Sequence, residues 1–131
     1  MNKTKGANAE RELLHMLSDA GFAVVRVAGS GTMAETSADL IAGNISKKFV
    51  IECKTCKKNK RYLEKQQIND LKKFAKKFGF PPLIAVKFSR KGWWFIEPEK
   101  LDDVGKGLAI SLEDIQKRGL NFEQITGNNN I

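Results

Sequence analysis

The stretch Phe49-Val50-Ile51-Glu52-Cys53-Lys54 predicts a β-strand in which an apolar run ends in an acid and a base. Because side chains alternate between the two faces of a strand, Glu52 and Lys54 project together. The side chains of Ile51 and Cys53 project to the opposite face. The end of this strand therefore carries a carboxylate beside an ammonium group.

A second acid, Asp39, lies thirteen positions before Glu52 and directly precedes the apolar run Leu40-Ile41-Ala42. Two neighbouring carboxylates repel unless a cation lies between them. Hard oxygen ligands suit Mg²⁺, which keeps several waters and contacts substrate phosphates. The pattern is typical of a metal-dependent phosphodiesterase, in which Lys54 orients or activates the attacking water, or offsets negative charge on the phosphorus.

Length and charge favour one domain that binds nucleic acid. The chain of 131 residues falls within the usual size of a single hydrophobic core, and 41% of its residues are hydrophobic. Its 23 Lys and Arg residues outnumber 15 Asp and Glu residues, and the net charge of +8 attracts polyanions. No apolar run approaches the ~20 residues that span a bilayer, and residues 1–6 do not resemble a signal peptide. We therefore expect a cytoplasmic protein with no membrane partner.

The two cysteines, Cys53 and Cys56, form a C-x-x-C motif. A zinc site needs four ligands, and the chain has only these two cysteines and one histidine. A redox C-x-x-C usually opens a helix, whereas this motif closes a predicted strand. We therefore interpret Cys53 as a small buried hydrophobic residue, and no disulfide is expected in a reducing cytoplasm.

The first helix is predicted over residues 8–20, where three leucines recur at helical spacing and Gly21 ends the element. Glu10 shares the face of Leu13 and Leu17, which packs on the sheet. An acid in the first turn is also favoured by the helix dipole, by about 0.3–1 kcal/mol. The helix dipole explains why an acid occurs here but not why its side chain lies on the inward face of the helix. Glu10 is therefore a candidate third acid of the site.

A strand over residues 22–27 is followed by a Gly-Ser-Gly loop that runs to about residue 37. The glycines beside Ser30 let the backbone approach a phosphate, with the hydroxyl as a further donor, although such loops are also ordinary linkers. Strands over residues 38–42 and 48–54 come next. They are joined through Gly43-Asn44, a hairpin turn signal.

The second half of the chain predicts one long helix and two further strands. The helix extends over residues 57–78, and the strands over residues 83–88 and 93–96. The apolar stripe of the helix consists of Leu71, Phe74, Ala75 and Phe78. The resulting order, αβββαββ, gives an α/β fold with a five-stranded mixed sheet flanked by helices.

Beyond residue 98 the pattern weakens. A short helix is predicted over residues 111–118, because Ser111 and Asp114 form a capping pattern. The tail after residue 126 is expected to be frayed. We expect a single nuclease domain over residues 1–131, with a core over about 5–98 and a C-terminal extension over 99–131.

Asp39 and Glu52-Cys53-Lys54, at this spacing, resemble the PD-(D/E)xK motif of restriction-endonuclease-like nucleases, with Ala38 in place of the proline. The resemblance extends to residues 5–13, 21–30 and 83–88, the last followed by Gly92-Trp93. Together these motifs resemble the archaeal Holliday junction resolvases of the Hjc type, over approximately the first hundred residues.

This resemblance implies a restriction-endonuclease-like fold and a Mg²⁺-dependent crossover junction endonuclease, with Mn²⁺ as a substitute metal. It implies a homodimer that nicks two opposing strands of a four-way DNA junction during recombination and repair. We expect the protein to associate with the nucleoid, and other recombination or replication proteins are candidate partners.

Site roles follow from the family positions, the basic runs and the apolar stripe. The expected catalytic residues are Glu10, Ser30, Asp39, Glu52 and Lys54, and the expected metal ligands are Glu10, Asp39, Glu52 and Cys53. The expected DNA contacts are Lys3, Lys5, Arg11, Arg26, Ser30, Lys57, Lys58, Lys60 and Arg61. A two-fold axis supplies two identical sites for symmetric cutting, and the expected dimer contacts are Leu71, Phe74 and Phe78.

Two other functions stay open from the residues alone. A nuclease of the same fold that acts on other branched or linear DNA differs only in its substrate. A non-catalytic DNA-binding protein leaves Glu10, Asp39 and Glu52 unexplained, because carboxylates facing DNA weaken binding unless a metal neutralises them. In each case the affinity for DNA should fall steeply with salt.

Overall fold

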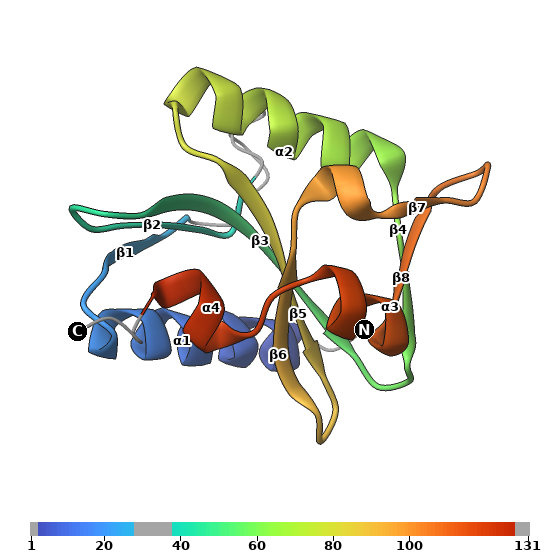
Figure 1. Ribbon diagram of the computed structural model, residues 1–131, viewed down its shortest axis with the longest axis horizontal. Helices are drawn as coiled ribbons and strands as arrows, with labels where there is room; N and C mark the ends of the chain where they lie inside the picture. Colours follow the sequence, from blue (N-terminus) through green and yellow to red (C-terminus); the bar gives the residue numbers. More distant parts are fainter. Residues whose placement is uncertain (1–2, 28–37, 128–131) are drawn as a thin grey trace.

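A five-stranded mixed sheet forms the centre of the protein (Figure 1). The computed structural model describes residues 3–27 and 38–127. The strands of this sheet are β1 (Ala23–Arg26), β2 (Leu40–Gly43), β3 (Lys48–Cys56), β5 (Pro82–Phe88) and β6 (Gly92–Ile96). Their order is β1-β2-β3-β5-β6; β3 and β5 are parallel, and the other neighbouring pairs are antiparallel. The predicted α/β class and five-stranded mixed sheet are confirmed.

The β2–β3 hairpin fixes the position of the acids. Its turn is closed by the side chain of Asn44, whose Oδ1 accepts hydrogen bonds from the backbone N–H groups of Ser46 and Lys47 at 2.8 and 2.7 Å. This local bonding is why asparagine is favoured in turns. The hairpin pairs Leu40 with Ile51, so the residues before β2 lie beside the end of β3.

The two faces of the sheet are covered by different helices, α1 (Lys3–Asp19) and α2 (Lys65–Phe78) (Figure 1). Helix α1 begins earlier than predicted and buries Leu13 and Leu17 in one core cluster, together with Ile51. Helix α2 buries its apolar residues in the second hydrophobic core cluster. The crossover through α2 allows β3 and β5 to run parallel.

The prediction of one helix over residues 57–78 is wrong. The chain leaves β3, turns and forms strand β4 (Lys60–Leu63), and α2 begins only at Lys65. Strand β4 pairs with β8 (Leu108–Ser111), which also pairs with β7 (Asp102–Asp103) in a second, three-stranded sheet. This pairing joins residues far apart in the chain, so local periodicity does not reveal it.

The C-terminal part of the chain packs on both core clusters. It contains a 3₁₀ turn, η1 (Pro98–Lys100), and helices α3 (Leu112–Arg118) and α4 (Phe122–Thr126). The predicted cap of α3 is present, because Ser111 Oγ accepts from the Asp114 N–H at 3.0 Å. Ile115 of α3 and Ile125 of α4 are fully buried in opposite clusters. Helix α4 was not predicted, and residues 128–131 lie outside the described part.

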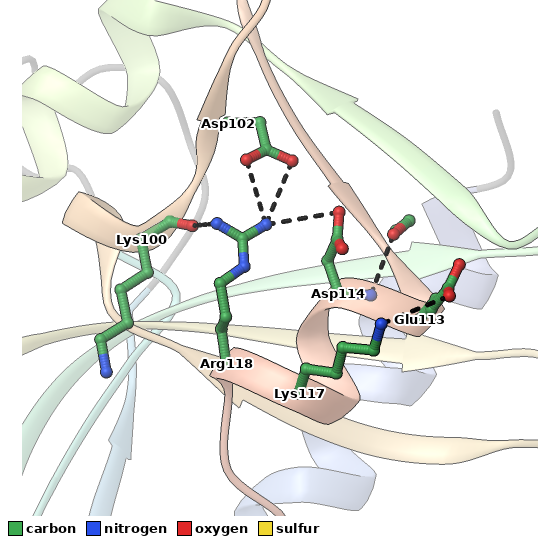
Figure 2. A network of polar contacts seen from close by, with 7 residues as sticks. Lys100, Asp102, Glu113, Asp114, Lys117 and Arg118 are labelled. Carbon is green, nitrogen blue, oxygen red and sulfur yellow. Dashed lines mark hydrogen bonds and ion pairs between the residues drawn. The ribbon is translucent and has the colours of Figure 1, made fainter.

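Arg118 ties this part of the chain together (Figure 2). Its guanidinium donates to the Lys100 carbonyl at 2.9 Å and pairs with Asp102 at 3.0 Å and Asp114 at 3.3 Å. Each of these side chains is partly solvated, so a single pair contributes only ~0–1 kcal/mol. The shared guanidinium nevertheless joins η1, β7 and α3 in one arrangement.

None of the helices in the described ranges combines the length and the hydropathy required to cross a bilayer.

Candidate active site

Asp39 and Glu52 meet across the β2–β3 pair. Extending the register from Leu40 and Ile51 by one residue sets Asp39 opposite Glu52. Asp39 is held at the backbone, since its N–H donates to the Ile51 carbonyl at 2.8 Å and its carbonyl accepts from the Val27 N–H at 2.9 Å. Its Oδ2 accepts from the Cys53 N–H at 2.8 Å. One carboxylate oxygen of Asp39 is therefore committed to the strand that carries Glu52.

Glu52 and Lys54 are linked through Gln67, which lies in the first turn of α2. The Gln67 amide donates from Nε2 to Glu52 Oε2 at 2.9 Å and accepts at Oε1 from Lys54 Nζ at 2.8 Å. Lys54 Nζ also lies 3.4 Å from Glu52 Oε2. The Glu52 and Lys54 side chains are only 7% and 13% exposed. Gln67 thus holds a buried acid and a buried base in one fixed arrangement.

Glu10 reaches the site from α1. Its Oε1 lies 2.8 Å from the Nε of Arg26, on β1. The acids border one cavity of about 290 Å³. Its lining residues are Gly6, Ala9, Glu10, Asp39, Glu52, Cys53, Lys54, Thr55 and Arg61. The structure therefore brings together Glu10, Asp39, Glu52 and Lys54, as the sequence predicted.

In the absence of a cation, burial and mutual repulsion raise the pKa values of the two central carboxyl groups. Burial raises the pKa of Glu52 to about 7, and the negative charge of Asp39 adds to this rise. Burial likewise raises the pKa of Asp39 to about 6, although the hydrogen bond from Cys53 opposes this rise. Both effects penalise the charged form, and a bound cation relieves both.

The donor set fits a divalent cation. The buried carboxylate of Glu52 and the partly buried carboxylate of Asp39, both with raised pKa values, supply hard oxygen ligands, and a hydrated metal completes its shell with water or phosphate oxygens. As the side chains lie, no group of three His, Cys, Asp or Glu residues in the described ranges forms a ready metal cluster. Glu10 is bonded to Arg26, so Asp39 and Glu52 are the preformed part of the site.

The raised pKa of Glu52 predicts a pH-dependent gain in stability for Glu52→Gln. In metal-free protein, the Glu52 contribution to stability is fully present below the unfolded pKa and is lost as pH rises through the raised folded pKa. Glutamine carries no charge and escapes this loss. We expect the variant to exceed wild type in free energy of unfolding by about 1–3 kcal/mol at pH 8. Near pH 4 the two proteins should be alike.

Urea unfolding in EDTA at pH 4 and pH 8 measures this difference. Glu113→Gln is the control, because that exposed acid lies on α3 and pairs only with Lys117 among the described residues. If wild type and Glu52→Gln were equally stable at pH 8, burial would not raise the pKa of Glu52 in the folded protein.

Cys53 can take part in metal binding only through its backbone. Its side chain packs with the α1 cluster, on the face of β3 opposite to Glu52. Burial raises the pKa of its thiol well above the usual value, which disfavours the thiolate that a metal requires. Cys53 and Cys56 are both free, and the Cys56 thiol lies 2.9 Å from the Lys58 carbonyl, in the turn before β4.

The predicted DNA-binding residues fall into three groups. Arg11, Lys57, Lys58 and Lys60 are exposed, as a phosphate contact requires. Arg26 is partly exposed and paired with Glu10, and Arg61 is half-buried at the cavity. Ser30 and the side chains of Lys3 and Lys5 lie outside the described residues.

The predicted dimer contacts differ in exposure. Leu71 is fully buried within its own subunit and offers no surface to a partner. Phe74 is partly buried, and Phe78 is 46% exposed. Phe78 packs edge-on against Phe80, with 4.7 Å between ring centroids. The aromatic surface at the end of α2 therefore remains available for contact with a partner.

Gln67 is the site residue that sequence reasoning missed. It precedes Leu71 by four positions and Phe74 by seven, so it continues the apolar stripe of α2 by one turn towards β3. A polar residue at an inward helical position is the signal that points to it. That signal is clear only once the helix is known to begin at Lys65.

Comparisons with known proteins identify relatives of this chain. The family model described as "Archaeal holliday junction resolvase (hjc)" matches residues 1–130. Crossover junction endodeoxyribonuclease Hjc of Methanocaldococcus jannaschii is 39% identical over 123 residues, or 94% of this chain and 87% of that protein. Its namesake in Archaeoglobus fulgidus is 37% identical over 125 residues, or 95% and 91%. The solved structure of Archaeoglobus fulgidus Hjc, a Holliday junction resolvase, superimposes with a TM-score of 0.87 at 34% identity, covering 93% of this chain and all of that one. The chain therefore belongs to the archaeal Holliday junction resolvase (Hjc) family.

Proposed function

We propose that this protein is a crossover junction endodeoxyribonuclease that resolves four-way DNA junctions by Mg²⁺-dependent hydrolysis. The convergence of Asp39, Glu52 and Lys54 in one cavity supports a phosphodiesterase. Family membership and the relatives named as crossover junction endodeoxyribonucleases support the junction as its substrate. The net charge of +8 favours a polyanionic substrate and association with the nucleoid.

In the proposed reaction, each side chain of the site has a separate task. Asp39 and Glu52 would hold the divalent ion, and Glu10, which is paired with Arg26, would be a further candidate ligand. The ion supplies Lewis acidity towards a phosphate oxygen and lowers the pKa of water. Lys54 offers its ammonium to the attacking water or to charge that develops on the phosphate, and Gln67 fixes its direction. We propose Mg²⁺ in particular because the donors are oxygens, with Mn²⁺ as a substitute.

We further propose a homodimer in which Phe74 and Phe78 contact the partner subunit. Opposing strands of a junction must be cut symmetrically, and two identical sites on a two-fold axis supply this symmetry. Exposed aromatic residues are typical of interface centres. We expect a mass in solution of twice 14.6 kDa, and a shift towards the monomer in Phe78→Asp. A monomeric wild type would contradict this arrangement, and Lys73→Asp on the exposed side of α2 is the matched control.

The test of the proposed function compares a fixed four-way junction with a linear duplex of the same sequence, in Mg²⁺ and in EDTA. Paired symmetric nicks confined to the junction and lost in EDTA are the expected result. Equal cutting of both substrates would point instead to a general nuclease. Tight binding without cutting in any divalent metal would identify a non-catalytic DNA-binding protein.

A further inference from the structure

Arg61 differs from the other basic residues near it. It lies on β4, where Lys60 and Tyr62 are exposed while Arg61 and Leu63 turn inward. The alternation of a strand therefore directs a guanidinium into the molecule. Removing a charged group from water is costly unless it is paired, and Arg61 is half-buried, so part of its guanidinium has lost solvent.

The inward side of β4 borders the cavity of the acids. Arg61 lines this cavity together with Asp39, Glu52 and Lys54. Its Nε is buried and has no hydrogen-bond partner among the described residues. A buried donor without an acceptor is unfavourable, so the described residues do not by themselves satisfy the guanidinium of Arg61.

Lys54 and Arg61 are the cations among the described residues that line the cavity, and their contacts differ. The Lys54 ammonium is occupied by Gln67 and lies 3.4 Å from Glu52. Arg61 makes no ion pair within the described ranges, although it lines the same cavity as three carboxylates. Of the cavity cations in the described ranges, Arg61 is thus the one whose charge remains available to an incoming anion.

We propose that Arg61 binds the scissile phosphate in this cavity through its guanidinium group. The inference rests on the proposed nuclease function and assigns to Arg61 a role distinct from that of the exposed lysines. A planar guanidinium presents two parallel N–H donors to two phosphate oxygens, and such a bidentate contact fixes orientation as well as charge. Arg61 then positions the phosphorus against the water and the divalent ion, and it balances charge that grows in the transition state.

Arg61→Gln tests this role, with Lys73→Gln as the control. The control also removes one positive charge, but from an exposed position on α2 away from the cavity lining. Two quantities are measured: the Kd for a junction in EDTA, and the single-turnover nicking rate with enzyme and Mg²⁺ saturating. Arg61→Gln should lower the saturated rate by about 100-fold. Arg61→Gln should also weaken junction binding more than Lys73→Gln does, because only Arg61 is proposed to contact a phosphate directly.

Chemical rescue separates a phosphate contact from a structural role. Arg61→Ala leaves space at the cavity, and guanidinium ion should restore part of its nicking rate, whereas sodium chloride at the same ionic strength should not. Arg61→Lys keeps the charge but loses the planar pair of donors, so its saturated rate should stay well below wild type. If Arg61→Gln fails to fold, as judged by its melting transition, the Arg61→Lys rate decides.

Each remaining outcome has one meaning. A wild-type saturated rate in Arg61→Gln, or in Arg61→Lys where only that variant folds, overturns the inference. A slow Arg61→Ala that guanidinium does not restore assigns the residue to structure instead. Absence of nicking by wild type itself would overturn the proposed function, so the two failures are distinguishable.

Discussion

Glu52→Gln and Asp39→Asn are each expected to lower the saturated rate of junction nicking by at least about 10³-fold. Both carboxylates line the same cavity, and the pKa of each is raised chiefly by burial, an effect that a bound cation would offset. The amide variants keep the shape of the side chains but lose the charge that holds the ion. Junction binding in EDTA should be unchanged or tighter, because a negative charge that repels phosphate has been removed.

Single-turnover nicking with excess Mg²⁺ measures this loss, and electrophoretic mobility of the junction measures binding. Glu113→Gln serves as the control, since its carboxylate is exposed on α3. Full activity of either variant in excess metal would exclude the proposed metal site. Loss of binding together with activity would indicate instead that the two acids maintain the fold of the hairpin.

Lys54→Met is expected to lower the saturated nicking rate by about 10²-fold while divalent metal binds at least as tightly as in wild type. The ammonium lies 3.4 Å from Glu52, where it competes with a bound cation, so its removal should leave the carboxylate free for the metal. Methionine fills a similar volume in this largely buried position. The chemistry should therefore fail although the metal site remains occupied.

Two measurements are required for this variant. Titration with Mn²⁺ by paramagnetic resonance gives the metal affinity, and single-turnover cleavage gives the rate. Lys106→Met on the exposed chain between β7 and β8 controls for the loss of a lysine. An unchanged rate would remove Lys54 from the reaction, and a parallel loss of metal affinity would mean that it organises Glu52 instead of acting on the substrate.

Much of the site could be predicted because its signals are local. The hairpin turn at Gly43-Asn44 fixes the register that sets Asp39 beside Glu52, and strand alternation sets Glu52 with Lys54. The helical phase of Glu10 against Leu13 and Leu17 directs it towards the sheet. Each of these relations spans a few residues or one hairpin, a range over which sequence spacing determines geometry.

The parts that escaped prediction depend on contacts between distant segments. Strand β4 exists because Lys60–Leu63 pairs with Leu108–Ser111, and a lysine-rich run with helical periodicity on one side gives no sign of that partner. The error in the start of α2 then hid Gln67, whose inward position follows from a helix that begins at Lys65. The inward turn of Arg61 was hidden for the same reason.

The backbone hydrogen bond between Val27 and Asp39 anchors Asp39 directly before β2. The Val27 N–H donates to the Asp39 carbonyl at 2.9 Å, so the chain leaves and re-enters the sheet at one fixed point. The entropy of closing a segment grows only slowly with its length, by ~0.6 kcal/mol for each doubling. Residues can therefore be inserted or deleted between these two anchors at small cost and without displacing Asp39. The position of Asp39 opposite Glu52 is thus independent of the length of that connection.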